Sequence, residues 1–165
     1  MFRSGYAYFF VFTLVVAMGV MSAPAPVHAG WSPFKTYTVQ AAFGDVTNDV
    51  SEAIINQGLV VDFNANVGEM LQRTSKDVGA TKQVYKNALM MMFCSAKYTR
   101  EAVEADSSNI MFCPYSVMVF ELADAPGTVH VGYRPPKAGG SLASRKALLR
   151  VETLLDTIAR EATGN

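Results

Sequence analysis

A repeated tripeptide carries both cysteines of this chain, as Met92-Phe93-Cys94 and Met111-Phe112-Cys113. In an exported protein such a pair is usually a disulfide, and less often a soft-metal or redox site. A disulfide would close a loop of about 18 intervening residues and add ~3 kcal/mol to stability in the chain-entropy model. The cysteine pair therefore limits the fold to arrangements that bring Cys94 and Cys113 together, unless the two work separately.

The first 29 residues have the layout of a secretory signal peptide. Arg3 gives a basic start, an uncharged apolar run extends to about Ala23, and residues 27–29 place small side chains at the −3 and −1 positions. We therefore expect cleavage after Ala29, a mature N-terminus at Gly30, and a periplasmic or secreted location. An uncleaved anchor is the alternative, because the apolar run approaches the ~20 residues that span a bilayer.

By length, the mature chain is a single domain, which we place at residues 36–165 after a mobile tail at residues 30–35. Loss of Arg3 leaves one basic residue fewer than acidic residues. This balance argues against a nucleic-acid partner held by phosphate contacts, which need a basic face, and we expect none. Cleavage also leaves His130 as the remaining histidine, which excludes a zinc or iron site built from several histidines.

Hydrophobic periodicity predicts strands and helices in alternation. The strands are expected at residues 36–43, 59–65, 87–94, 110–122 and 128–133, with Pro114 delaying the start of the fourth. The helices are expected from Asp45 or Thr47 to Gln57, and over residues 68–78, 95–105 and 141–162. This order predicts an α+β domain around one mixed or antiparallel sheet.

The last predicted helix carries an apolar stripe at three- and four-residue spacing, from Leu148 through Val151, Leu155 and Ile158 to Ala162. Such a stripe is usually a core face that packs on a sheet. A dimer seam is the alternative interpretation, although the stripe is short for a coiled coil.

Five segments together resemble the family known as domain of unknown function 302. They are residues 91–96, 110–115, 117–121, 129–133 and 134–136, and the resemblance extends from Tyr37 to Ala162. It implies a TATA-binding-protein-like α+β fold with helices packed on one face of the sheet, and a homodimer as an assembly to expect. It implies no established enzymatic activity. Glycine is common in the family where Cys94 stands and leucine where Cys113 stands, so this chain resembles an exported, cysteine-bearing branch.

The strand arrangement decides whether the cysteines meet. If residues 87–94 and 115–122 are antiparallel neighbours, the end of the first strand lies beside the start of the second, and Cys94 lies near Cys113. Parallel neighbours would place the two cysteines at opposite ends of the sheet.

Three chemical roles stay open for the pair. The first is a structural disulfide. The second is a reduced pair that binds Cu(I) with Met92, since thiolate and thioether sulfurs suit this ion, although methionine is also a common filler of cores. The third is sulfur redox chemistry at Cys94, whose thiolate would be favoured by the following helix N-terminus and by Lys97.

A candidate ligand pocket lies near the cysteine end of the sheet. Its expected residues are Ser95, Pro114, Tyr115, His130, Tyr133 and Arg134. Arg134 could bind an anion bidentately or form a surface salt bridge, and His130 could act as a base or simply face solvent. The sequence shows no Ser-His-Asp order, phosphate loop or paired catalytic carboxylates. We therefore expect an exported, non-enzymatic binding or accessory domain without a cofactor, whose partner is a small molecule or a periplasmic protein.

Overall fold

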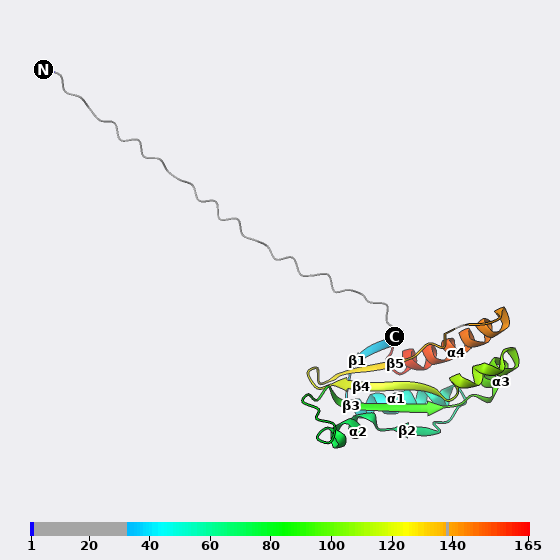
Figure 1. Ribbon diagram of the computed structural model, residues 1–165, viewed down its shortest axis with the longest axis horizontal. Coiled ribbons are helices and arrows are strands. Elements are labelled where there is room, and N and C mark those ends of the chain that lie inside the picture. Colours follow the sequence, from blue (N-terminus) through cyan, green and yellow to red (C-terminus); the bar gives the residue numbers. More distant parts are fainter. Residues whose placement is uncertain (2–32, 138) are drawn as a thin grey trace. The chain divides into compact units, whose positions relative to one another are not determined.

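The computed structural model describes Met1, residues 33–137 and residues 139–165. The predicted signal peptide apart from Met1, its cleavage site and residues 30–32 of the predicted tail lie outside the described residues. The elements in chain order are β1 (Lys35–Gln40), α1 (Phe43–Asn56), β2 (Phe63–Ala65), α2 (Val67–Thr74), β3 (Tyr85–Phe93), α3 (Ala96–Ala105), the 3-10 helix η1 (Ser107–Phe112), β4 (Tyr115–Leu122), β5 (Thr128–Tyr133) and α4 (Leu142–Glu161) (Figure 1).

The described strands form one five-stranded sheet in the order β1-β5-β4-β3-β2. Each neighbouring pair in it is antiparallel, which confirms the α+β class and resolves the choice between a mixed and an antiparallel sheet. The β3–β4 ladder pairs Phe93 with Tyr115. The end of β3 therefore lies beside the start of β4, as the antiparallel alternative predicts.

One face of the sheet packs against α1 and α4. Alternate residues of β3, β4 and β5 point into this core, and α1 contributes Val46, Val50 and Ile54. The predicted stripe of α4 is buried in the same core, with Val151 and Ile158 fully covered. The stripe is thus a core face of this domain, and the dimer-seam interpretation of it is wrong.

A buried carboxylate fixes the β4–β5 hairpin at the end of the sheet opposite the cysteines. Glu121 is 2% exposed, and it accepts hydrogen bonds from the Gly127 N–H at 2.8 Å, Lys86 Nζ at 3.0 Å and Asn87 Nδ2 at 2.7 Å. The hydrogen bond from Gly127 is the main cause that lowers the pKa of Glu121, with Lys86 and Asn87 adding to it against the effect of burial. These contacts keep a charged side chain inside the fold.

Three predicted boundaries in the first half of the domain are wrong, and in the first of them the strand expected over residues 36–43 ends at Gln40. The strand expected over residues 59–65 is limited to β2, because β3 ends at Phe93 and residues 59–61 have no strand beside them. The first helix begins at Phe43, before either expected cap, and Ala42 precedes it without a side-chain cap. The hydroxyl of Thr47 instead donates to the Gly44 carbonyl at 2.7 Å.

Two further segments differ from the expected elements. The helix α2 ends at Thr74 rather than at Val78, and turns continue to Gly79, which has a positive φ. The residues before Pro114 form η1 instead of an early part of the strand. The strand β4 then begins at Tyr115, as the position of Pro114 predicts.

Candidate functional site

A disulfide joins Cys94 to Cys113, whose Cα atoms lie 6.2 Å apart. It closes the excursion made by α3 and η1 and ties the end of β3 to the start of β4. Cys94 is exposed, and its N–H donates to Asp62 Oδ2 at 2.9 Å. The disulfide interpretation of the pair is confirmed, and the bond lies at an accessible edge of the domain.

Ser95 follows the disulfide and caps α3. Its hydroxyl accepts the Tyr98 N–H at 3.4 Å, and the residue is almost fully buried. The side chain therefore serves the helix N-terminus, as the sequence predicts for a cap, and it is not among the described residues that line the cavity below.

The face of the sheet opposite α1 and α4, which we call the open face, is also largely apolar. Directly paired residues point to the same face, and the ladders pair Ala88 with Phe120, Met90 with Met118, Met92 with Ser116, Met118 with Gly132, and Phe120 with His130. Small residues thus alternate with methionine and phenylalanine across this face. The small positions leave room above the sheet, and the larger side chains wall that room in.

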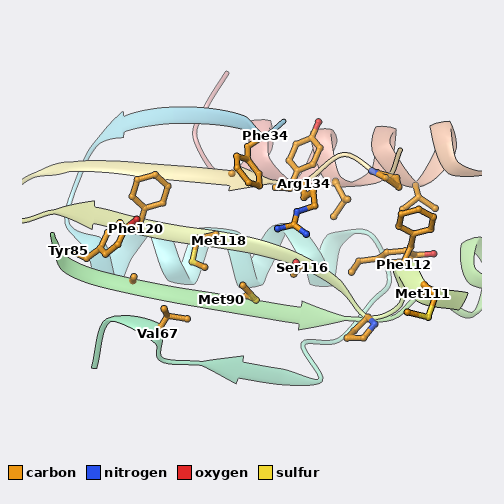
Figure 2. Close-up of a pocket in the computed structure, with 18 residues that line it drawn as sticks. Phe34, Val67, Tyr85, Met90, Met111, Phe112, Ser116, Met118, Phe120 and Arg134 are labelled. Carbon is orange, nitrogen blue, oxygen red and sulfur yellow. The ribbon is translucent and has the colours of Figure 1, made fainter. Parts of the chain in front are cut away.

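A cavity of about 730 Å³ extends over this region, and its described lining also includes Tyr115, Tyr133, Val151 and Leu155 from the helix-covered side. Figure 2 shows Met90, Met118 and Ser116 on its floor, Tyr85 and Phe120 at one end, and Phe112 and Met111 at the other. The rings of Tyr85 and Phe120 meet edge to face with centroids 5.8 Å apart. The volume falls within the range of roughly 300–1,000 Å³ that is typical of small-molecule sites.

The disulfide holds one wall of this cavity in place. Met111, Phe112 and Pro114 flank Cys113 in the chain, and all three line the cavity. Because Cys113 is fixed to the end of β3, the last turn of η1 cannot move far from the sheet. The disulfide thus helps to fix the shape of the cavity.

Arg134 is the charged residue of the described cavity lining. Its guanidinium lies over the ring of Phe34, 5.5 Å from the centroid, and Figure 2 shows it directed over the sheet toward Ser116. No carboxylate of the described residues lies within ion-pair distance of it. The salt bridge that the sequence left open for Arg134 is therefore not formed by the described residues.

His130 lies on the open face but behind the cavity wall. Its ring stacks on Phe120 with centroids 4.7 Å apart, and its Nδ1 lies 3.2 Å from the hydroxyl of Thr38. It is not among the described lining residues. Phe120 and Thr38 thus hold the ring, and no described carboxylate binds it as an acidic partner binds a general base.

The two candidate tyrosines are held on the helix-covered side. The Tyr115 hydroxyl lies 3.2 Å from Thr99 Oγ1, and burial raises the pKa of Tyr115. The Tyr133 hydroxyl donates to Asp156 Oδ1 at 2.6 Å. Both residues are among the described lining residues, but their hydroxyls are engaged elsewhere.

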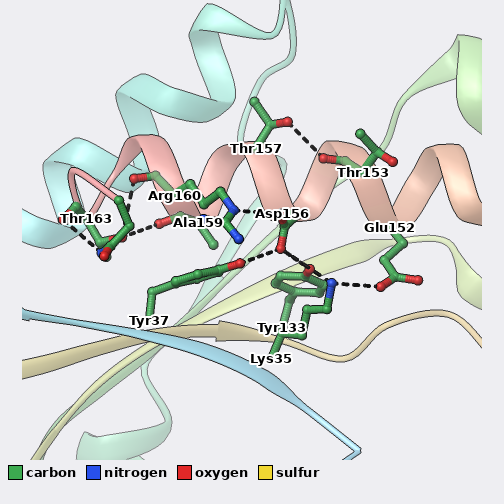
Figure 3. Close-up of polar contacts among 11 residues, drawn as sticks. Lys35, Tyr37, Tyr133, Glu152, Thr153, Asp156, Thr157, Ala159, Arg160 and Thr163 are labelled. Atoms are coloured by element: carbon green, nitrogen blue, oxygen red, sulfur yellow. Dashed lines mark hydrogen bonds and ion pairs between the residues drawn. The ribbon is translucent and has the colours of Figure 1, made fainter.

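Asp156 on α4 collects a polar cluster that holds β1 and β5 to the helix (Figure 3). Tyr37 and Tyr133 both donate to its Oδ1 at 2.6 Å, and Arg160 Nε binds its Oδ2 at 2.8 Å. Burial acts to raise the pKa of Asp156, but the hydrogen bonds from Tyr133, Tyr37 and Arg160 outweigh it and hold the pKa well below the usual range. Burial and the bond to Asp156 together raise the pKa of Tyr133. The cluster stabilises the fold beneath the cavity.

The sulfur side chains do not form a metal site of the expected kind in this oxidised form. Met92 lies on the open face opposite Ser116, but both cysteine sulfurs are in the disulfide. Among the described residues, no group of three or more histidine, cysteine, aspartate or glutamate side chains could hold a metal ion. A Cu(I) site at Cys94, Cys113 and Met92 would therefore first require reduction.

Sequence reasoning missed most of the cavity. Of its expected pocket residues, Pro114, Tyr115, Tyr133 and Arg134 are among the described lining residues, whereas Ser95 and His130 are not. It did not propose Phe34, Phe120 or the pair Met90 and Met118 as pocket residues. The available signal was that β3 and β4 are apolar at both alternating sets of positions, which is unusual for an antiparallel sheet covered on one face.

Two comparisons place the chain among known proteins. The family model described as "Domain of unknown function DUF302" matches residues 35–162. The crystal structure of an uncharacterized conserved DUF302 protein from Bacillus stearothermophilus is similar with a TM-score of 0.65 at 16% identity, and the similarity covers 78% of this chain and 97% of that one. No curated protein matches. No helix among the described residues is long and apolar enough to span a membrane. The family match covers most of the chain, and this protein belongs to the DUF302 family, as the resemblance predicts.

Proposed function

We propose that this protein is an exported binding domain that holds a small, largely apolar molecule in the cavity on the open face. The observation that carries the proposal is the cavity of about 730 Å³ over a sheet face made of methionine, phenylalanine and small residues. In this proposal the Cys94–Cys113 disulfide is a structural staple that shapes one wall.

The composition of the open face supports this role. An antiparallel sheet with one face in solvent normally carries polar side chains on that face. Here Met90, Met118 and Phe120 occupy it and are half-buried. Covering apolar area gains about 25 cal/mol per Å², so an apolar ligand would remove from water a surface that the domain itself leaves uncovered.

The polar groups near the cavity favour binding over catalysis. The hydroxyls of Tyr115 and Tyr133 are engaged with Thr99 and Asp156, and the pKa of each tyrosine is raised, first by burial. Tyrosines of this kind are poorly suited to give up a proton near neutral pH.

The first test measures occupancy of the cavity with N-phenylnaphthylamine, a neutral apolar dye that brightens when it leaves water. We expect the oxidised domain to bind the dye and the Met118→Trp variant to lose binding, because the larger indole ring would occupy part of the cavity volume. Met70→Trp is the matched control, since Met70 is on α2 and outside the described cavity lining. Absence of dye binding by the unsubstituted protein, or equal binding by both variants, would refute the proposal.

The second test addresses export. The full chain is expressed in a Gram-negative host, and the intact mass of the periplasmic protein is measured with and without reduction and thiol alkylation. We expect a chain that begins at Gly30 and whose cysteines alkylate only after reduction. A full-length precursor kept in the cytoplasm would contradict export.

A second candidate function is thiol redox or Cu(I) handling by the cysteine pair. The observation that favours it is the exposure of Cys94, which lets a reductant reach the bond. The nearby carboxylate of Asp62 acts against it, because a negative charge beside Cys94 disfavours a thiolate. In the reduced protein, this candidate requires that Cys94→Ser abolish copper binding or thiol reactivity while the fold is kept, and a reduced protein with neither property would eliminate it.

A further inference from the structure

We infer that the cavity selects an amphiphile with an apolar body and a single carboxylate, and that Arg134 binds the carboxylate. The inference rests on the proposed function, because it names the ligand class of the same cavity. It depends on where one cation lies in a cavity whose other described lining residues carry no formal charge.

The charge balance of the cavity favours a monoanion. Arg134 is the one residue of the described lining with a formal charge, and none of the described lining residues is acidic. Arg134 is exposed, so water also reaches its guanidinium, but an anion bound beside apolar walls is best stabilised by a partner of opposite sign. A single guanidinium neutralises a carboxylate but leaves a dianionic phosphate with excess charge, and it repels a cationic ligand.

The geometry places the guanidinium of Arg134 over the sheet beside Ser116 (Figure 2). Tyr133 pairs with Val117 in the β4–β5 ladder, and continuing that register by one residue places Arg134 opposite Ser116. The ring of Phe34 lies against the guanidinium at 5.5 Å from its centroid. A cation–π contact with a ring leaves the N–H groups of an arginine available for a bidentate carboxylate.

A second donor lies at the same place. Ser116 is half-buried and lines the cavity, and its side chain has no hydrogen-bond partner among the described residues. A carboxylate between Ser116 and Arg134 would accept from both. Charge-assisted hydrogen bonds of this kind are the stronger ones in proteins.

The remaining length of the cavity suits the apolar body. From Ser116 the floor continues over Met118 and Met90 toward Phe120 (Figure 2). Gly132 lies beside Met118 in the ladder, and a Cβ at this position would lie 2.9 Å from the Lys35 carbonyl oxygen. The absence of a side chain there keeps the floor open beside Met118.

The test compares octanoate with 1-octanol, which share the apolar body and differ in the charged head. Each is titrated into the oxidised domain by calorimetry near neutral pH, and each is also used to displace N-phenylnaphthylamine. We expect octanoate to bind up to about fivefold more tightly than octanol, which corresponds to the ~1 kcal/mol upper range of an ion pair with an exposed cation. Arg134→Gln should remove this preference while leaving octanol affinity unchanged, and Arg134→Lys should keep part of it.

The matched control is Arg100→Gln, which removes an equal charge from an exposed position on α3 that is not among the described lining residues. It should keep the preference for octanoate. Equal affinity for both probes, or a preference that survives Arg134→Gln, would overturn the inference and leave the apolar cavity standing. If neither the dye nor either probe binds, the proposed function is overturned as well. A stable dimer in which a second copy covers the open face and keeps the dye and both probes out would also overturn it.

Discussion

Replacing Asp156 by asparagine tests whether the cluster between α4 and the sheet stabilises the domain through charge. Asparagine keeps the size of the side chain and one acceptor oxygen, so Tyr37 and Tyr133 can still donate to it. It loses the negative charge that now faces both hydroxyls and Arg160. The substitution therefore resembles permanent protonation of Asp156.

The contacts give the size of the expected loss. Two hydroxyls donate to Oδ1 at 2.6 Å, and a hydrogen bond to a charged group is worth about 1 kcal/mol more than a neutral one. The ion pairs with Arg160 and Lys35 have cations that are about half exposed, so each adds at most about 0.5 kcal/mol. We expect Asp156→Asn to lower the free energy of unfolding by about 2–3 kcal/mol at pH 7.

The effect depends on pH in a defined direction. The pKa of Asp156 is lower in the folded state than in the unfolded chain, so its stabilisation is complete above the unfolded pKa of about 4 and is lost as the pH falls toward the folded pKa. The difference between the two proteins should be constant from pH 5 to 8 and should shrink progressively below about pH 4.

Urea unfolding followed by far-UV circular dichroism measures this difference across the pH range. Asp49→Asn is the control, because Asp49 is exposed on α1 and should change stability little. If Asp156→Asn is as stable as the parent at pH 7, or if the deficit does not diminish in acid, then the charge of Asp156 does not stabilise the fold as argued.

Two further substitutions test the staple and the floor of the cavity. Cys94→Ser with Cys113→Ser should cost about 3 kcal/mol in urea unfolding, because the unfolded chain regains the freedom of the closed loop; unchanged stability would show that the bond does not restrain the chain. Gly132→Ala should cost about 1–3 kcal/mol and shift the amide resonances of β1, because the new Cβ would lie 2.9 Å from the Lys35 carbonyl oxygen. Gly44→Ala meets nothing within 4 Å and should not destabilise α1, and an equal loss in both glycine variants would reject the steric explanation.

Local patterns predicted the elements whose boundaries depend on nearby residues. Ser95 caps α3 as expected, Pro114 sets the start of β4, and the spacing of Val151 and Ile158 identifies the buried face of α4. The three signals are the capping side chain of Ser95, the missing backbone N–H of Pro114 and the helical spacing of apolar residues in α4. Each of them acts within a few residues of the chain.

Features that depend on distant partners were not predictable in the same way. The length of β2 is set by where β3 ends, and the polar cluster at Asp156 needs two strands and a helix to meet. Arg134 was foreseen as a candidate anion ligand, and that role stays a prediction. Its position beside Phe34 follows from the sheet order, which no local pattern reveals.

The β3–β4 ladder is fixed at both of its ends. The disulfide ties Cys94 to Cys113 at one end, and at the other Glu121 on β4 binds Lys86 and Asn87 on β3. Neither strand can therefore fray from its terminus, and a slip of one residue would break both connections. We therefore expect the backbone amides between these points, and with them the floor of the cavity, to be among the slowest in the domain to exchange with solvent deuterium.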